Sequence, residues 1–165
     1  MLRTPKISDA KTALAFINAL VEEDAQILVN KKVTLKEEKK WLEGMLKRIR
    51  KNEVHMISVF DGKENVGSAA VERGLWRQSH VGTIRISVKR DYRGIGLGTL
   101  LLKKIIEVAK KDSGIKVLTL GVYAGNTIAR NLYHKIGFKT IAKLPKRILY
   151  KGKFADEYMM DYPLI

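Results

Sequence analysis

Three glycines at alternate positions, Gly94, Gly96 and Gly98, separate a strand pattern from a helix pattern. Residues 81–88, which precede them, are rich in β-branched side chains and partly alternate, which is typical of a strand. Residues 97–109 carry apolar side chains at helical spacing. Because another strand pattern follows this helix, the sequence predicts a parallel α/β crossover in which the glycines form the helix entrance.

The segment before this crossover predicts two helices and a hairpin. Apolar residues recur at helical spacing over residues 10–21, behind Ser8, which is a good N-cap residue. A second helix is predicted from Thr34, which begins a capping-box pattern. Residues 54–72 contain two strand patterns around an Asp-Gly turn signal, and they predict an antiparallel hairpin.

The segment after the crossover helix predicts three more strands and one more helix. Residues 116–122 have the pattern of a buried strand. Residues 126–135 predict a helix that Gly137 ends in the left-handed conformation. Two further strands are expected within residues 138–165, with a link at residues 150–153. The predicted fold class is therefore α/β.

The composition limits the classes of protein to which the chain can belong. Its 165 residues can bury a real core, and no repeat or linker divides them, so we expect one domain over residues 1–165. No apolar run approaches the roughly 20 residues of a membrane-spanning helix, so no membrane partner is expected. The absence of Cys excludes disulfides, thiolate zinc sites and a Cys nucleophile. Residues 1–11 contain no export signal, which favours a cytoplasmic location.

The net charge is the strongest deviation in the composition. The chain has 32 Lys and Arg against 17 Asp and Glu, a formal net charge of +15. This excess favours a phosphate-bearing partner or a solvated, lysine-rich surface. A nucleic-acid-binding module is an alternative, because no Asp or Glu occurs between Ser113 and Ala155. The chain lacks zinc-ligand spacing and an aromatic-rich strand, so nucleic acid is not expected as the primary partner.

The glycine segment has the features of a phosphate site. Amides at a helix entrance point outward at the positive end of the helix dipole, and glycine lets the backbone approach phosphate oxygens closely. A dinucleotide site would need G-x-G-x-x-G and an acidic residue about 20 positions later. This segment has G-x-G-x-G and no such acid. A nucleoside-triphosphate loop would need Lys between Gly98 and Thr99, and none is there.

Residues 93–98, RGIGLG, and residues 126–138, NTIARNLYHKIGF, contain two motifs at a fixed distance. The first fits the pattern of Arg or Gln, two residues, Gly, one residue, and Gly or Ala. Together they resemble the GNAT superfamily of acetyl-CoA-dependent N-acetyltransferases, clearly over about residues 54–140. The resemblance implies a mixed, mostly antiparallel central sheet of about six to seven strands flanked by helices, with a splayed parallel pair at the cofactor site.

The resemblance implies an N-acyltransferase that uses acetyl-CoA and releases coenzyme A. In such enzymes a strand pairs with the pantetheine arm, loop amides hold the diphosphate, and an Asn bonds the arm. A primary amine of a protein N-terminus, a lysine or a small amino compound attacks the thioester directly in a ternary complex, without a metal. The implied cofactor-binding residues are Ile86, Ser87, Val88, Arg93, Gly94, Ile95, Gly96, Leu97, Gly98, Thr99, Asn126 and Tyr133.

The resemblance also implies catalytic roles. Tyr133 matches the general acid that protonates the leaving sulfur, and the Val88 amide would stabilise the oxyanion. The general base is open, because relatives that acetylate ribosomal-protein N-termini usually carry Glu at the position of Gly121. Glu72, at the end of the hairpin, is the candidate base. His80 and loss of the proton to solvent are the alternatives.

The acceptor is left open by the resemblance, because fold does not determine substrate. A charge of +15 disfavours a polyamine, unless Asp156, Glu157 and Asp161 form a local acidic pocket. A protein amine or a small amino compound is the better expectation. A family member that binds coenzyme A without turnover is a further alternative, and a homodimer is compatible with the sequence.

Overall fold

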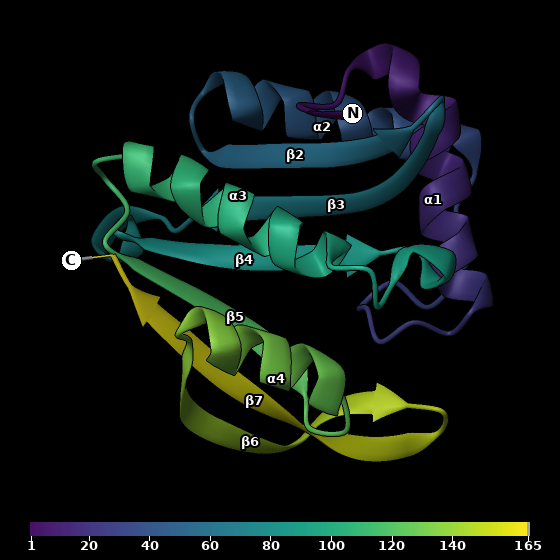
Figure 1. The fold of residues 1–165 in the computed structure, drawn as a ribbon. Helices are drawn as coiled ribbons and strands as arrows, with labels where there is room; N and C mark the ends of the chain where they lie inside the picture. Colours follow the sequence, from purple (N-terminus) through teal and green to yellow (C-terminus); the bar gives the residue numbers. More distant parts are fainter. Residues whose placement is uncertain (165) are drawn as a thin grey trace. The chain divides into compact units, whose positions relative to one another are not determined.

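The structure, a computed structural model, describes residues 1–164 (Figure 1). Ile165, the last residue of the second predicted C-terminal strand, lies outside the described residues. The strands are β1 Leu2–Arg3, β2 Val54–Asp61, β3 Glu64–Arg73, β4 Val81–Val88, β5 Val117–Tyr123, β6 Lys139–Tyr150 and β7 Lys153–Pro163. The helices are α1 Ala10–Glu22, α2 Leu35–Arg50, α3 Leu97–Lys111 and α4 Thr127–Ile136, with short 3₁₀ turns at Ile7–Asp9, Trp76–Gln78 and Arg90–Tyr92.

The strands form one seven-stranded sheet by hydrogen bonding, in the order β1-β2-β3-β4-β5-β7-β6. Strands β1 and β2, β2 and β3, β5 and β7, and β6 and β7 pair antiparallel. Strands β4 and β5 pair parallel through residues 81–83 and 117–119. The predicted mixed, mostly antiparallel sheet with a parallel pair is therefore confirmed. Strand β1 was not predicted, because two residues are too few to show an alternating pattern.

The chain divides into two compact units. The first consists of Met1–Glu72 and Arg85–Ala109, and the second of Arg73–Ile84 and Lys110–Ile165. Strand β4 contributes residues to both units. The single domain expected from the sequence stays a prediction.

In the first unit, helices pack on the β2-β3 hairpin. The side chains of Leu97 and Leu101, on α3, lie against Gly67 of β3. Helix α2 begins at the capping box that the sequence predicts, because the Thr34 hydroxyl accepts from the Glu37 amide at 3.3 Å. The long apolar stripes of these helices face the sheet, as their 3.6-residue period requires.

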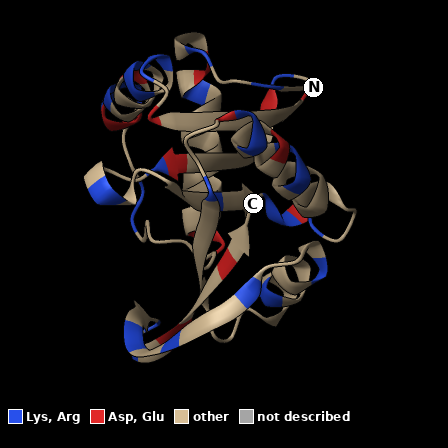
Figure 2. Cartoon of the chain, turned by 90° about the vertical axis from the view of Figure 1, so that its left-hand side faces the viewer, with Lys and Arg blue, Asp and Glu red and all other residues tan. Residues whose placement is uncertain are grey.

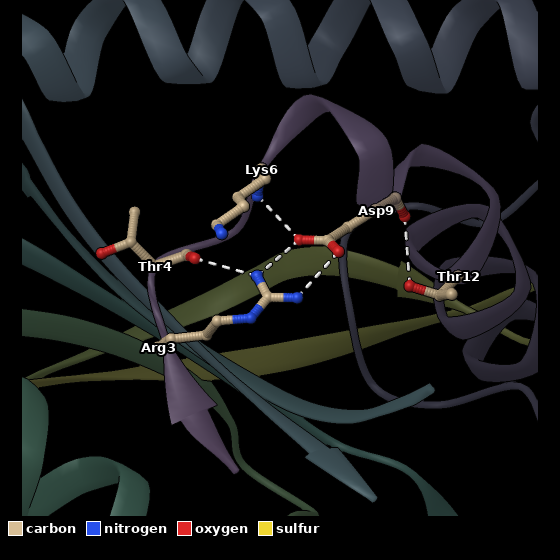
Figure 3. A network of polar contacts seen from close by, with 5 residues as sticks. All are labelled: Arg3, Thr4, Lys6, Asp9 and Thr12. Atoms are coloured by element: carbon tan, nitrogen blue, oxygen red, sulfur yellow. Dashed lines mark hydrogen bonds and ion pairs between the residues drawn. The ribbon is translucent and has the colours of Figure 1, made fainter. Parts of the chain in front are cut away.

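The start of α1 is fixed by a polar network in the first unit (Figure 3). The Asp9 carboxylate accepts two hydrogen bonds from the Arg3 guanidinium, at 2.6 and 2.8 Å, and one from the Lys6 amide at 2.7 Å. The Arg3 guanidinium lowers the pKa of Asp9. The expectation that Ser8 caps this helix is wrong, because a 3₁₀ turn over Ile7–Asp9 precedes α1 and Asp9 holds the N-cap position.

In the second unit, α4 lies along β5 and β7 (Figure 1). Phe138 is buried, with its ring centroid 5.9 Å from that of Tyr133 and 5.2 Å from that of Tyr162. Gly137 ends the helix with φ 115°, so the predicted left-handed C-cap is confirmed. This aromatic cluster fixes the α4 face that carries Tyr133.

Candidate active site

The loop between β4 and α3 takes a backbone path that needs glycine. Gly94 and Gly96 have φ values of 77° and 87°, which residues with a Cβ atom rarely adopt. No atom lies within 4 Å of the place where a Cβ atom would stand on either residue. Gly98 is the second residue of α3. The loop therefore has open space beside both of its left-handed glycines.

The amides of residues 94–99 have no acceptor in the described part of the chain. The Arg93 amide donates to the Arg90 carbonyl and the Leu100 amide to the Gly96 carbonyl, each at 3.0 Å. Between them, no amide of residues 94–99 donates to any backbone or side-chain group within residues 1–164. Helix amides without acceptors need an external partner, and an anion is the partner that the helix dipole favours. The donor set fits a diphosphate.

Side chains next to this loop are held by carboxylates of the same unit. The Arg93 guanidinium donates to the Val88 carbonyl at 2.8 Å and pairs with Glu23, whose side chain is largely buried. The Tyr92 hydroxyl donates to Asp61 at 2.9 Å. These contacts fix the turn that precedes the loop. Arg93 therefore fixes the position of the loop. The donors available to a ligand are the backbone amides of residues 94–99.

The strand residues expected to pair with the pantetheine arm lie directly before this turn. Ile86, Ser87 and Val88 are half-buried at the end of β4, in the first unit. The same unit contains the glycine loop and Glu72. Asn126 and Tyr133 belong to the second unit.

Asn126 is the N-cap of α4. Its side-chain oxygen accepts a hydrogen bond from the Ala129 amide at 3.1 Å. Its side-chain nitrogen donates to no group in the part of the chain that the structure describes. One end of this amide therefore stabilises the helix, and the other end is available to a ligand.

Tyr133 is a buried residue of α4, with 7% of its surface exposed. Burial raises the pKa of its hydroxyl to about 12. Within residues 1–164 the hydroxyl has no hydrogen-bond partner. Its oxygen is not fully enclosed by protein atoms. The phenol thus stays protonated near neutral pH, and its proton passes only to a strong base formed beside it.

The two base candidates from the sequence lie in different environments. The Glu72 carboxylate accepts from the Arg48 guanidinium at 2.6 Å, and Arg48 also lies 3.6 Å from Glu53. Pairing with Glu72 raises the pKa of Arg48. His80 is exposed ahead of β4, and its carbonyl accepts from the amides at the start of β5. Glu72 is therefore already neutralised by a cation.

A third acidic residue, Glu157 of β7, lies over Gly121 of β5. A Cβ atom on Gly121 would lie 2.9 Å from Glu157 Cδ. From the sequence, Glu157 was expected only to contribute, with Asp156 and Asp161, to a local acidic pocket. The adjacent acids at positions 156 and 157 can be seen in the sequence. The strand register that brings Glu157 to Gly121 cannot be predicted from it.

The basic residues are spread over helices, loops and strands in the view of Figure 2. Of the three acids near the end of the chain, Asp156 is paired with Lys143 at 3.0 Å and accepts from the Lys146 amide at 2.9 Å. Asp161 has one enclosed oxygen without a hydrogen bond.

No helix within residues 1–164 is long and apolar enough to cross a membrane.

Known proteins match this arrangement in sequence. The family model described as Acetyltransferase (GNAT) family matches residues 17–138. An N-alpha-acetyltransferase of Sulfurisphaera tokodaii is 34% identical over 90 residues, which are 54% of this chain and 51% of that protein, so the chain spans about half of its length. An L-methionine sulfoximine/L-methionine sulfone acetyltransferase of Pseudomonas paraeruginosa is 27% identical over 167 residues, 99% of this chain and 94% of that protein.

A solved structure matches the fold over the whole of this chain. The structure of yncA from Salmonella typhimurium with its cofactor acetyl-CoA has a TM-score of 0.86 and 22% sequence identity, and the match covers 100% of this chain and 94% of that chain. The family match spans most of the sequence and includes both motifs described above. The chain therefore belongs to the acetyltransferase (GNAT) family.

Proposed function

We propose that this chain acetylates an α-amino group, on a free amino acid derivative or on a protein N-terminus, and that residues 94–99 bind the diphosphate of acetyl-CoA. The observation that carries the second part is the run of amides without acceptors at the start of α3. Glycine at positions 94 and 96 leaves room for phosphate oxygens against the backbone. The arrangement supplies neutral donors aligned with the positive end of a helix dipole.

The proposal gives a role to each of the other cofactor-binding residues expected from the sequence. The backbone of Ile86, Ser87 and Val88 pairs with the amide-bearing pantetheine arm, as a strand pairs with a sheet edge. The free side-chain nitrogen of Asn126 donates to the same arm. Arg93 positions the loop through its bonds to Val88 and Glu23. Acetyl-CoA, when bound, supplies a thioester carbonyl that an amine can attack.

Tyr133 is the proposed proton donor to the leaving sulfur. Its hydroxyl is protonated, has no hydrogen-bond partner among the described residues and is not fully enclosed. Loss of solvation would raise the basicity of a leaving thiolate as it raises the pKa of the phenol, so the sulfur can take that proton as its bond to carbon breaks. The Val88 amide is proposed to stabilise the oxyanion that develops on the carbonyl oxygen.

The two relatives described above favour an α-amine as acceptor. One is named an N-alpha-acetyltransferase, and L-methionine sulfone, which appears in the name of the other, has its only amine at the α position. A protein N-terminus and L-methionine sulfone each carry a primary amine on the carbon next to a carbonyl or carboxylate carbon. A polyamine lacks that group, and the charge of +15 repels it.

A thiol-release assay with matched amines tests the proposal. The panel contains L-methionine sulfone, a peptide with a free N-terminus, Nα-acetyl-lysine, whose only amine is the ε-amine, and spermidine. We expect release of coenzyme A with the first two. Turnover of Nα-acetyl-lysine or spermidine alone would overturn the α-amine assignment. Binding of coenzyme A in a calorimeter without turnover of any amine would instead assign a binding protein.

A further inference from the structure

The face of β5 and β7 around Gly121 holds a carboxylate. These strands pair with Gly121 opposite Met159 and with Tyr123 opposite Glu157. Opposed residues share a face of the sheet, and so do residues two apart in a strand. A side chain at position 121 would lie 2.9 Å from Glu157 Cδ and closer still to Glu157 Oε1. The Glu157 carboxylate therefore fills the space that glycine leaves open.

The Glu157 side chain has no partner among the described residues, although Lys and Arg are abundant in the sequence. Its neighbour Asp156 has both a lysine side chain and a backbone amide as partners. The Glu157 carboxylate has no hydrogen bond or ion pair with any residue that the structure describes. Gly121 is exposed and Glu157 is half-exposed. A ligand that reaches this face would thus meet a carboxylate with free lone pairs.

The surroundings of Glu157 in its own unit contain few charges. Tyr123 stands opposite Glu157 on β5, with the Tyr150 ring edge-on at 5.6 Å. Asp161 faces the same side four residues farther along β7, opposite Lys139 of β6. Leu144 of β6 stands directly opposite Glu157 on its other side. No cation is thus placed directly opposite the carboxylate on either neighbouring strand.

We propose that Glu157 is the general base of the acetyl transfer, acting from β7 over Gly121 of β5. The proposal rests on the proposed function. Glycine at position 121 cannot take a proton, but it leaves the room into which the neighbouring strand places its carboxylate. Glu72, by contrast, holds a guanidinium on its carboxylate. Among the described residues, the Glu157 carboxylate has no partner that an acceptor amine would have to displace, whereas the Glu72 carboxylate accepts from Arg48.

The proposed step balances in protons and bonds. Glu157 takes one proton from the acceptor ammonium, which leaves the nitrogen with a lone pair, and passes that proton to solvent. The nitrogen forms a bond to the carbonyl carbon while the carbon–sulfur bond breaks, and sulfur leaves with the electron pair. Tyr133 gives its proton to that sulfur, and the second nitrogen proton restores the phenol.

The first test compares Glu157→Gln with Asp156→Asn, an adjacent variant with the same loss of charge. With L-methionine sulfone, or with whichever amine of the panel reacts, we expect Glu157→Gln to lower kcat about 100-fold. Asp156→Asn should keep kcat within about twofold. Coenzyme A affinity in a calorimeter should be unchanged in both. In the Gln variant the rate should rise with pH up to the pKa of the acceptor amine, because only the neutral amine then reacts.

The second test moves the carboxylate. Gly121→Ala should lower kcat as Glu157→Gln does, because the new methyl group displaces the carboxylate without removing it. The double variant Gly121→Glu with Glu157→Gly places a carboxylate on β5 instead of β7 and should recover at least a tenth of wild-type kcat. Recovery would not follow if Glu157 only stabilised the strand pair.

The outcomes separate this inference from the function on which it rests. A wild-type chain that binds coenzyme A but acetylates no amine overturns the proposed function and the role of Glu157 with it. An active wild type whose Glu157→Gln variant keeps its kcat and its pH profile overturns the role of Glu157 alone. A calorimetric loss of coenzyme A binding in that variant would also overturn it, because a base is not needed for binding.

Discussion

Helices α3 and α4 both follow a strand, but the amides of their first turns have different partners. At α4 the Asn126 side chain accepts from the Ala129 amide, so the chain caps this helix itself. At α3 the amides of residues 94–99 donate to no backbone or side-chain group among residues 1–164. Helix ends are normally satisfied, so an uncapped end beside two left-handed glycines indicates a place for a ligand.

The difference also separates the kinds of groups that the two units offer. The unit that contains α3 offers backbone donors, which bind an anion but do not exchange protons. The unit that contains α4 offers the protonated phenol of Tyr133 and the unpaired carboxylate of Glu157. We infer that binding depends mainly on the first unit and proton transfer on the second. Each of the variants below changes a residue in one of the two units.

The largest effect is expected from closing the open end of α3. Gly96→Glu places a carboxylate where the diphosphate should lie, and we expect coenzyme A affinity in a calorimeter to fall more than 100-fold. Gly62→Glu is the matched control, because Gly62 also has positive φ and open space around it but lies in the β2-β3 turn. Each substitution strains the backbone by about 1 kcal/mol. Equal affinity in the two variants would exclude the loop as the diphosphate site.

Removing the Tyr133 hydroxyl should impair chemistry and spare binding. We expect Tyr133→Phe to lower kcat about 30-fold, with the KM for acetyl-CoA within about twofold of wild type. Tyr162→Phe removes a hydroxyl from the same aromatic cluster and should keep kcat. A Tyr133→Phe variant with full kcat would dismiss the residue as the acid.

The same variant should change the alkaline stability of the protein. Burial raises the pKa of Tyr133 to about 12, above its ordinary value of 10.0. The folded state then keeps a proton that the unfolded state loses, so its stabilisation is complete below pH 10 and is lost as the pH rises towards 12. The loss amounts to roughly 3 kcal/mol. Tyr133→Phe should show less of this decline in denaturant unfolding at pH 9 and 11.5.

A smaller effect is expected at the cap of α4. Asn126→Ser keeps an oxygen that can cap the helix but removes the side-chain nitrogen, so it should weaken coenzyme A binding about threefold and leave the melting temperature unchanged. Asn126→Ala removes both and should also cost about 1 kcal/mol of unfolding free energy. If the Ser variant binds coenzyme A like the wild type, Asn126 acts only as a cap.

The smallest effect is expected from Glu72, in the unit assigned to binding. Its role as the base stays a prediction from the sequence. Because Arg48 already holds the carboxylate, we expect Glu72→Gln to change kcat by less than about threefold. The loss of this half-exposed pair should reduce stability by about 1 kcal/mol or less. A Glu72→Gln variant that loses the rise of rate with pH would restore Glu72 as the base and count against Glu157.

The parts of the site that were predictable from the sequence are local. The glycine loop, the start of α2 and the left-handed end of α4 each depend on residues within one turn, so their spacing in the sequence is enough to predict them. Ser8 failed as a cap because the chain forms a 3₁₀ turn over Ile7–Asp9 before α1, which leaves Asp9 at the N-cap position. A pattern of apolar residues within one helix does not reveal such a turn ahead of it.

The parts that were not predictable depend on register between distant strands. Glu157 meets Gly121 only because β7 pairs with β5 antiparallel at one particular offset. A shift of one residue would move Glu157 to the other face of the sheet. Likewise, the pair between Arg48 and Glu72 joins the end of α2 to the end of β3. The general base was therefore the part of the site that was hardest to predict from the sequence.

The carboxylates that hold the turn before α3 affect how cofactor affinity depends on ionic strength. Arg93, Tyr92 and Lys89 contact Glu23, Asp61 and Glu64, so little net positive charge is left beside the loop. Dissolved salt screens attraction between exposed charges, whereas hydrogen bonds from neutral amides are much less affected. The contribution of the diphosphate to acetyl-CoA affinity should consequently be nearly the same at low and at moderate ionic strength.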